Sequence, residues 1–416
     1  MRKFLLLTDC VPSPHSTAGI MVAHLCRLFP KGSLCCFAVV NEGVPAAADL
    51  NWMPLQCEFA PRQIMSHFDL AKVQSWYSFA YQQIVARRKL AKLVPEIVRF
   101  AQAQGVEAIW CQLQGLNLIR LARPVAEKLG VPLFTQVLDP PTFILRLGRI
   151  DCYTRLAILK EYGRAISLSE RTAAISPAMA EDLQRDYGTE TVVVRPGFHR
   201  QFAQPIATEP TSSDTFAICI AGQGYASDEV FALMSALNSV NWQLAGKQIV
   251  VRFLGRRVEL ASLVPARIEY HGFHAQASSM EVLHNSDLLY AAYWLDPSYA
   301  IEVRQAFPSK LSTYLAAGRP VLFHGPLGCS PDTFLAEHDA AFRCHSNDRA
   351  KILEVLERAI VDRDEYAAVA YGGRTAFEEH LTLERQRDAF AQFLGVDAET
   401  LNTVDGARTR TAVSVS

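Results

Sequence analysis

Short apolar runs of strand length alternate with helical patterns through most of this chain, and this alternation constrains its fold more than any other feature. In the first half, such runs occupy residues 3–8, 33–40, 107–111 and 131–136, with helical periodicity between them. Strands joined through helices pair in parallel, and ligands bind at the carboxyl ends of such strands. The pattern predicts a doubly wound α/β sheet.

The alternation starts again after a Pro-, Thr- and Ser-rich stretch at residues 201–214, which we interpret as a linker. Because 416 residues exceed one ordinary core, we predict two Rossmann-like domains facing a central cleft. The first spans residues 1–200 and the second residues 215–380. We expect a helix at 381–396 to pack back on the first domain, and a disordered tail at 397–416.

Composition excludes several classes of protein. A formal net charge of −1 provides no general attraction to nucleic acid, so we expect no nucleic-acid partner. The 10 cysteines form no Cys-x-x-Cys pair, which is typical of a reducing compartment. No apolar segment approaches the ~20 residues of a membrane span. We expect a cytoplasmic protein, and leave open a location at the inner face of a membrane.

Residues 307–322, with the sequence FPSKLSTYLAAGRPVL, predict a short helix between two loop-forming signals. Pro308 suits a first helical turn, and Gly318 suits a left-handed helix end. Lys310 and Thr313 are three residues apart and share a face. Helix starts with basic residues favour anionic ligands, so the segment is a candidate phosphate site. An ordinary core helix is the alternative.

Other candidate ligand-binding residues follow strands of the second half. Gly222 and Gly224 form a Gly-x-Gly turn that lets a phosphate approach the backbone, although Ser227 replaces the third glycine of a dinucleotide fingerprint. Arg256 follows the next strand and is able to neutralise a diphosphate. Gly272 lies in a further turn. The alternatives are plain βα turns and a solvated arginine.

In the first half, Asp139 follows a strand and precedes two prolines, so it is a candidate for contacting an acceptor hydroxyl. The alternative is a rigid turn. His15 and Gly19 belong to a Pro-rich first loop that should line the cleft. The aromatic stretch at 68–81 suits sugar or lipid contact, or a helical core face. The histidines show no spacing typical of metal ligands, so we expect no metal and no cofactor.

Several segments taken together resemble the retaining, GT-B-fold glycosyltransferases of the large family 4-like group (glycosyl transferases group 1). They are residues 173–179, 193–198, 216–224 and 307–322, in the order that this family has. The resemblance implies that the second domain binds a nucleotide sugar and the first an acceptor. It also implies sugar transfer to a hydroxyl with retention of configuration and without a metal.

The resemblance implies roles for individual residues, with two departures. The family commonly has two glutamates eight positions apart, where this chain has Gln305 and Thr313. Glu302 is a substitute for the first. The residues expected in catalysis are Asp139 and Glu302. Those expected to bind the donor are Gly222, Gly224, Arg256, Gly272, Gln305, Ser309, Lys310, Leu311 and Thr313.

Three functions follow from these patterns. The first is a glycosyltransferase that acts on a glycan, a lipid-linked sugar or a small hydroxylated acceptor. The second, motivated by the missing glutamates, is a catalytically weakened sugar-nucleotide-binding or scaffold protein. The third is a sugar-nucleotide isomerase or epimerase on the same fold. The residues do not identify the base, the sugar, the acceptor or the oligomeric state.

Overall fold

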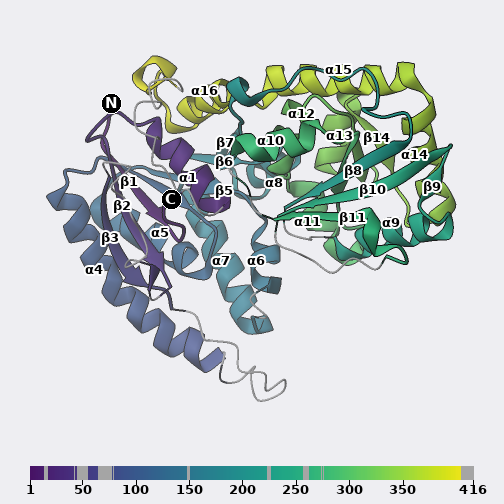
Figure 1. Cartoon of the computed structure of the whole chain (residues 1–416). Helices are drawn as coiled ribbons and strands as arrows, with labels where there is room; N and C mark the ends of the chain where they lie inside the picture. The colour runs from purple at the N-terminus through teal and green to yellow at the C-terminus, as the bar shows by residue number, and fades with distance from the viewer. Residues whose placement is uncertain are drawn as a thin grey trace. The chain divides into compact units, whose positions relative to one another are not determined.

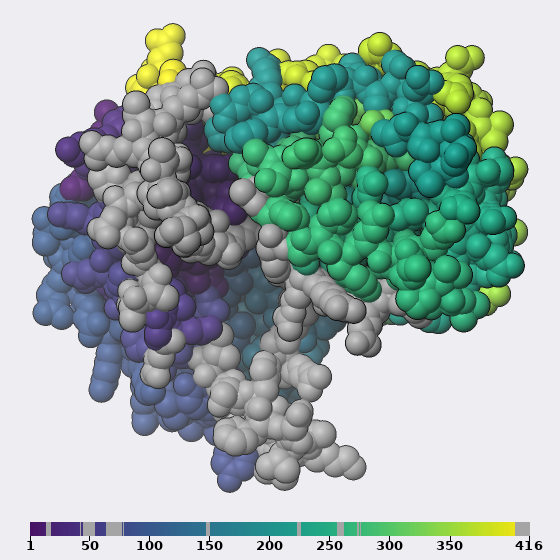
Figure 2. All heavy atoms as spheres, viewed as in Figure 1, coloured from purple at the N-terminus to yellow at the C-terminus, as the bar shows by residue number. Residues whose placement is uncertain are grey.

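A computed structural model of the chain forms two compact units, Met1–Val194 with the chain from Arg387, and Arg195–Gln386. The described residues, coloured in Figures 1 and 2, are 1–13, 17–41, 43–44, 55–63, 77, 79–147, 150–222, 226–255, 262–272, 274 and 276–403. Among them, no helix is both long and apolar enough to cross a bilayer.

The first unit contains a parallel sheet of seven strands in the order β3-β2-β1-β4-β5-β6-β7. The strands are β1 (Phe4–Thr8), β2 (Leu34–Val40), β3 (Gln56–Pro61), β4 (Ala108–Gln112), β5 (Leu133–Val137), β6 (Arg171–Ala174) and β7 (Glu190–Val193). Every residue of β1, β2, β4 and β5 is buried. Such continuous apolar runs suit a sheet that helices cover on both faces.

Helices connect these strands (Figure 1). They are α1 (Thr17–Arg27), the π-helix η1 (Tyr81–Ala86), α4 (Arg87–Ala103), α5 (Leu116–Leu129), α6 (Pro141–Leu147), α7 (Cys152–Leu168) and α8 (Pro177–Tyr187). Local signals set their ends. Ser176 caps α8 through its side chain, Pro177 occupies the first turn, and Gly188 ends the helix in a left-handed conformation.

The helix α16 (Leu383–Leu394) contributes aromatic side chains to the core of the first unit. The Phe390 ring lies 4.9 Å from that of Trp110, and the Phe393 ring 5.8 Å from that of Phe134. Beyond this helix, Leu401 is buried and the Asn402 amide donates to Leu28 O at 2.7 Å. The chain therefore stays packed on this unit as far as Asn402.

The second unit has a parallel sheet in the order β11-β10-β8-β12-β13-β14, with β9 antiparallel to β10. The strands are β8 (Thr215–Ala221), β9 (Gln243–Leu244), β10 (Lys247–Leu254), β11 (Ile268–Gly272), β12 (Leu288–Ala292), β13 (Val321–His324) and β14 (Ala341–Cys344). These two parallel sheets confirm the prediction of two Rossmann-like domains. The edge strand β3 and the short β14 lack the long apolar runs that predict strands from sequence.

The helices of the second unit are α9 (Ser227–Ser239), α10 (Gln276–His284), α11 (Ala300–Gln305), α12 (Lys310–Ala316), α13 (Ser330–Glu337), α14 (Arg349–Val361) and α15 (Arg363–His380). The stretch 201–214 belongs to this unit. Thr211 donates its amide and its hydroxyl to Asp287 Oδ1, at 2.6 and 2.8 Å. These hydrogen bonds to a buried carboxylate hold residues 201–214 against the sheet.

Candidate functional site

Three glycines end adjacent strands of the second unit. Gly222 follows β8, Gly255 follows β10 and Gly272 ends β11, with φ values of 98°, 135° and 72°. The Gly222 amide donates to Leu254 O and the Gly255 amide to Gly272 O, both at 2.8 Å. A Cβ at Gly255 would lie only 2.9 Å from Gly222 O. The three positions leave bare backbone at this edge, where a ligand is able to approach closely.

The helix α12 is tied to the same edge through Tyr314. The hydroxyl of this buried side chain accepts from the Ala221 amide at 2.8 Å and donates to Tyr290 O at 3.3 Å. Ser312 Oγ, on the same helix, donates to Pro196 O at 2.7 Å. Ala221 is the last residue of β8, so these bonds place the start of α12 relative to the glycine turn that follows this strand. Sequence patterns contain no signal for this link.

Lys310 begins α12 and carries a positive charge at this candidate site. Its side chain is half buried, and it makes no hydrogen bond or ion pair with any residue in the described ranges. Burial lowers the pKa of its ammonium group from 10.5 to about 8. The group remains mostly charged at pH 7, but it has lost hydration without gaining a partner. An anionic ligand would supply the missing interaction.

The other predicted residues of α12 differ in their surroundings. Leu311 is fully buried, and its amide donates to Pro308 O at 3.0 Å, so its side chain serves packing. Ser309 and Thr313 are half buried and are open to polar ligands. Gly224 and Arg256 lie outside the described residues.

Gln305 and Glu302 lie on α11, which follows β12. Gln305 is half buried, whereas Glu302 is only 2% exposed. Glu229, in the first turn of α9, is also 2% exposed and accepts from the Leu295 amide at 2.8 Å. The sequence contains no signal that singles out Glu229, because acidic residues are ordinary in first helical turns and their burial depends on the fold.

In the first unit, Asp139 lies just beyond β5 at the carboxyl edge of the sheet. Its carboxylate has no hydrogen-bond or ion-pair partner within the described part of the chain, and burial raises its pKa. Gly19 is in the first turns of α1, and its carbonyl accepts from the Ser13 amide at 3.2 Å. His15 is outside the described residues.

An ion pair that has no signal in the sequence also lies at this edge. Arg62 Nη2 lies 3.1 Å from Asp9 Oδ2 and donates to Asp9 O at 2.6 Å. Burial raises the pKa of Asp9, and the Arg62 charge offsets part of that rise. Asp9 follows β1 and Arg62 follows β3, so only the pairing of strands brings these two side chains together.

Replacing Tyr314 with phenylalanine should both destabilise the second unit and weaken ligand binding. The Ala221 amide would lose its acceptor, at a cost of about 1–3 kcal/mol in the free energy of unfolding. We expect urea unfolding to show this loss, and calorimetry to show weaker binding of UDP, GDP, ADP or dTDP.

Tyr366→Phe is the matched control for this prediction. The Tyr366 hydroxyl donates to Asp287 O at 2.7 Å in the same unit but makes no bond to the glycine turn. A similar loss of stability with unchanged nucleotide affinity is expected. Equal effects of the two variants on affinity would contradict a positioning role for Tyr314.

None of the models of known protein families matches this chain, and none of the curated proteins matches it significantly. Solved structures match nearly its whole length. Sucrose-phosphate synthase from Thermosynechococcus elongatus aligns with a TM-score of 0.67 at 12% identity, over 95% of this chain and 98% of that one. HepE from Anabaena, in complex with UDP and glucose, aligns with a TM-score of 0.63 at 14% identity, over 95% of this chain and 100% of that one.

The α,α-trehalose 6-phosphate synthase from Burkholderia multivorans gives a TM-score of 0.63 at 15% identity, over 95% of this chain and 98% of that one. At such identities the likeness shows the fold. This chain has the two-domain GT-B fold found in nucleotide-sugar glycosyltransferases. The fold class predicted from the alternation of strands and helices and the resemblance to GT-B-fold enzymes are both confirmed at the level of the fold.

Proposed function

We propose that this protein is a glycosyltransferase that moves a sugar from a nucleoside-diphosphate donor to a hydroxyl group, with retention and without a metal. One observation carries the proposal: the partially desolvated, unpartnered Lys310 stands at the start of α12, which Tyr314 ties to the glycine edge. The sequence resemblance to retaining enzymes supports it, as do HepE with UDP and glucose and a similar synthase with glucose-6-phosphate.

The chemical task is to stabilise the diphosphate as it leaves the sugar. Charge that develops on the phosphate oxygens is stabilised best by a group already fixed in place and poorly hydrated. Lys310 is partly desolvated and lies on a helix that the Tyr314 hydrogen bond holds in place, and a charge from the protein supports a mechanism without a metal. Gln305 is the better candidate for contacting the donor sugar, because a sugar hydroxyl would reach Glu302 only after local rearrangement.

On the acceptor side, we propose that Asp139 contacts the attacking hydroxyl. Burial raises the pKa of the Asp139 carboxyl group, which makes its carboxylate a better acceptor for a hydroxyl proton. Gly19, which the structure places in the first turns of α1 and not in the predicted loop, and His15 remain candidates for acceptor contact. The acceptor classes are a glycan, a lipid-linked sugar and a small hydroxylated molecule.

The test is release of nucleoside diphosphate from UDP-, GDP-, ADP- and dTDP-sugars, with and without acceptors from these classes, in buffer containing a chelator. Acceptor-dependent release with a retained anomeric configuration by NMR supports the proposal. Tight nucleotide binding without turnover would instead support the scaffold function. A rearranged sugar nucleotide formed without acceptor would support the isomerase or epimerase.

We further propose that the protein works in the cytoplasm at a membrane face. Ile84 and Leu156 are exposed apolar side chains on η1 and α7. Gln83 Nε2 donates to Thr154 Oγ1 at 3.2 Å, so these elements are adjacent. Exposed basic residues follow at the start of α4, namely Arg88, Lys89 and Arg87, of which Arg87 also pairs with Glu161 at 3.0 Å. Apolar and basic side chains together suit an anionic membrane surface.

The double variant Ile84→Glu, Leu156→Glu should bind vesicles of phosphatidylcholine and phosphatidylserine at least about tenfold more weakly, because two apolar side chains no longer enter the lipid. Cosedimentation measures the bound fraction. Leu263→Glu is the control, since Leu263 is 77% exposed in the other unit. Wild-type protein that stays in solution at low salt would overturn this location.

A further inference from the structure

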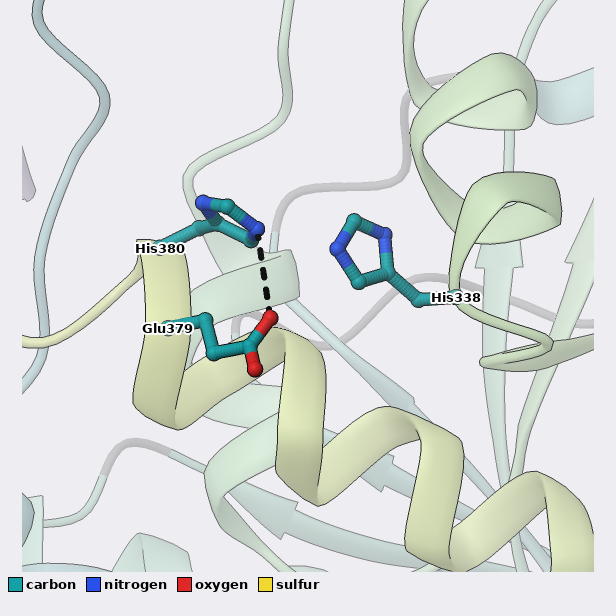
Figure 3. Close-up of side chains that lie close together, drawn as sticks. All are labelled: His338, Glu379 and His380. Carbon is teal, nitrogen blue, oxygen red and sulfur yellow. Dashed lines mark ion pairs between the residues drawn. The ribbon is translucent and has the colours of Figure 1, made fainter.

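Two histidines and a glutamate meet where two helices of the second unit end. His338 follows the last residue of α13, and Glu379 and His380 are the last residues of α15. Their ligand atoms all lie within 4.8 Å of one another, and Figure 3 shows the His338 ring facing the other two side chains. His380 Nε2 is 3.7 Å from Glu379 Oε2. Imidazole and carboxylate are ligands for first-row divalent metals.

The surrounding structure already orients His338 as a ligand. Its Nδ1 lies 2.9 Å from Phe334 O. A carbonyl oxygen only accepts, so Nδ1 carries the proton and Nε2 keeps its lone pair in the neutral ring. Histidine ligands of metals commonly donate their other N–H in this way. The Phe334 ring also packs on both imidazoles, with centroids 4.8 Å from His338 and 5.9 Å from His380.

The three side chains are exposed enough for their ligand atoms to move closer together around an ion. Tetrahedral coordination at metal–ligand distances of about 2.0–2.2 Å needs ligand atoms about 3.4 Å apart. Glu379 and His380 are exposed and His338 is half exposed, so small side-chain rotations suffice. Arg195 and Arg385 add positive charge near His380. The carboxylate of Glu379 is therefore needed to attract a cation.

We propose that His338, Glu379 and His380 form a binding site for a divalent transition metal of the Zn²⁺ class, with water completing the coordination. The residues that follow His380 pair with the stretch that enters this unit. The Phe198 amide donates to Leu381 O at 2.8 Å, and the Leu383 amide donates to Phe198 O at 3.1 Å. The ion would join the ends of α13 and α15 within the second unit.

The ion's role is structural and is separate from the proposed chemistry at Lys310. His338 and His380 are 42 positions apart in the sequence, and a cross-link between distant positions restricts the unfolded chain. Metal binding should therefore raise the melting temperature of the full-length protein and slow hydrogen exchange at the Phe198 and Leu383 amides.

The test is titration of chelator-treated full-length protein with Zn²⁺ by calorimetry, and with Co²⁺ by visible absorption. One ion per chain is expected. Glu379→Gln and His338→Ala should each weaken binding at least about tenfold, because loss of even an outer-shell contact costs this much. Glu379→Gln changes an exposed side chain, so this variant should fold normally. It keeps the test decisive even if the His338→Ala variant fails to fold.

His271→Ala is the matched control, because His271 also lies near a carboxylate, 3.5 Å from Glu269, but belongs to no close cluster of three ligands among the described residues. Its Zn²⁺ affinity should equal that of the wild type. Absence of saturable 1:1 binding, or equal affinity in all variants, would overturn the site. The measurement needs no substrate, so it is independent of whether the glycosyltransferase proposal holds.

Discussion

Replacing Lys310 with methionine is expected to stabilise the ligand-free protein while it removes most of its affinity for a nucleoside diphosphate. Burial without a partner lowers the pKa of this group to about 8. The shift corresponds to at most about 3 kcal/mol, which solvent screening of a half-buried group reduces to about 1–2 kcal/mol. Methionine keeps most of the packing and removes that cost. Diphosphate binding should weaken about 10–100-fold, because a hydrogen bond to a charged group is lost.

The pH dependence gives a second measurement of the same charge. The folded-state pKa of Lys310 lies below its unfolded value, so between about pH 8 and pH 10.5 the unfolded chain binds the additional proton. Through that window the contribution of Lys310 makes wild-type stability rise with pH. Lys310→Met should lack this contribution. Urea unfolding at several pH values, compared between the two proteins, measures it.

Two comparisons make the Lys310 prediction specific. Lys351→Met changes an exposed lysine on α14 and should alter neither the affinity nor this pH dependence. Lys310→Ala should weaken donor binding more than Asp139→Ala, since we assign Asp139 to the acceptor. Equal nucleotide affinity in the wild type and in the Lys310 variants would rule out the proposed phosphate contact.

Gly318→Ala should cause the largest loss of stability among single substitutions near the site. Gly318 has φ +71°, and a Cβ there would lie 2.2 Å from Pro205 O, a backbone atom. The Gly318 carbonyl accepts from the Ala207 amide at 2.8 Å, which holds that backbone in place. A left-handed conformation costs alanine about 1–2 kcal/mol, and overpacking adds about 1–3 kcal/mol. We expect the free energy of unfolding to fall by about 2–5 kcal/mol, the sum of these two costs.

Gly328→Ala separates the two contributions. Gly328 has a similar φ of +73°, but nothing lies within 4 Å of a Cβ at that position. Its substitution should cost only the conformational part, about 1–2 kcal/mol. Urea unfolding of the two variants measures the difference. Equal losses would mean that the 204–207 backbone moves easily away from the end of α12.

Sequence reasoning succeeded where a local pattern has one structural solution. The apolar runs at residues 3–8 and 131–136 became buried parallel strands, and Gly318 follows the end of α12 with a positive φ. Prediction from the sequence was less successful for side chains whose burial depends on distant segments that pack against them. Leu311 matches the donor-site pattern but is a core side chain, and Glu302 is 2% exposed despite its charge. β3 has exposed residues because it is an edge strand, so its sequence lacks a continuous apolar run.

By itself, the sequence determined the class of fold, because periodicity and the placement of Gly and Pro report local backbone preferences and which faces must be buried. Only the tertiary structure decided which polar groups meet. The hydrogen bond between Tyr314 and Ala221 joins residues 93 positions apart in the sequence. His338 and His380, which face each other, are 42 positions apart. Such pairs depend on strand order and helix packing, which form contacts between distant segments that no local pattern specifies. The same packing partly shields Lys310 from water without placing an acceptor beside it among the described residues. This residue of the sequence motif is therefore a candidate phosphate ligand.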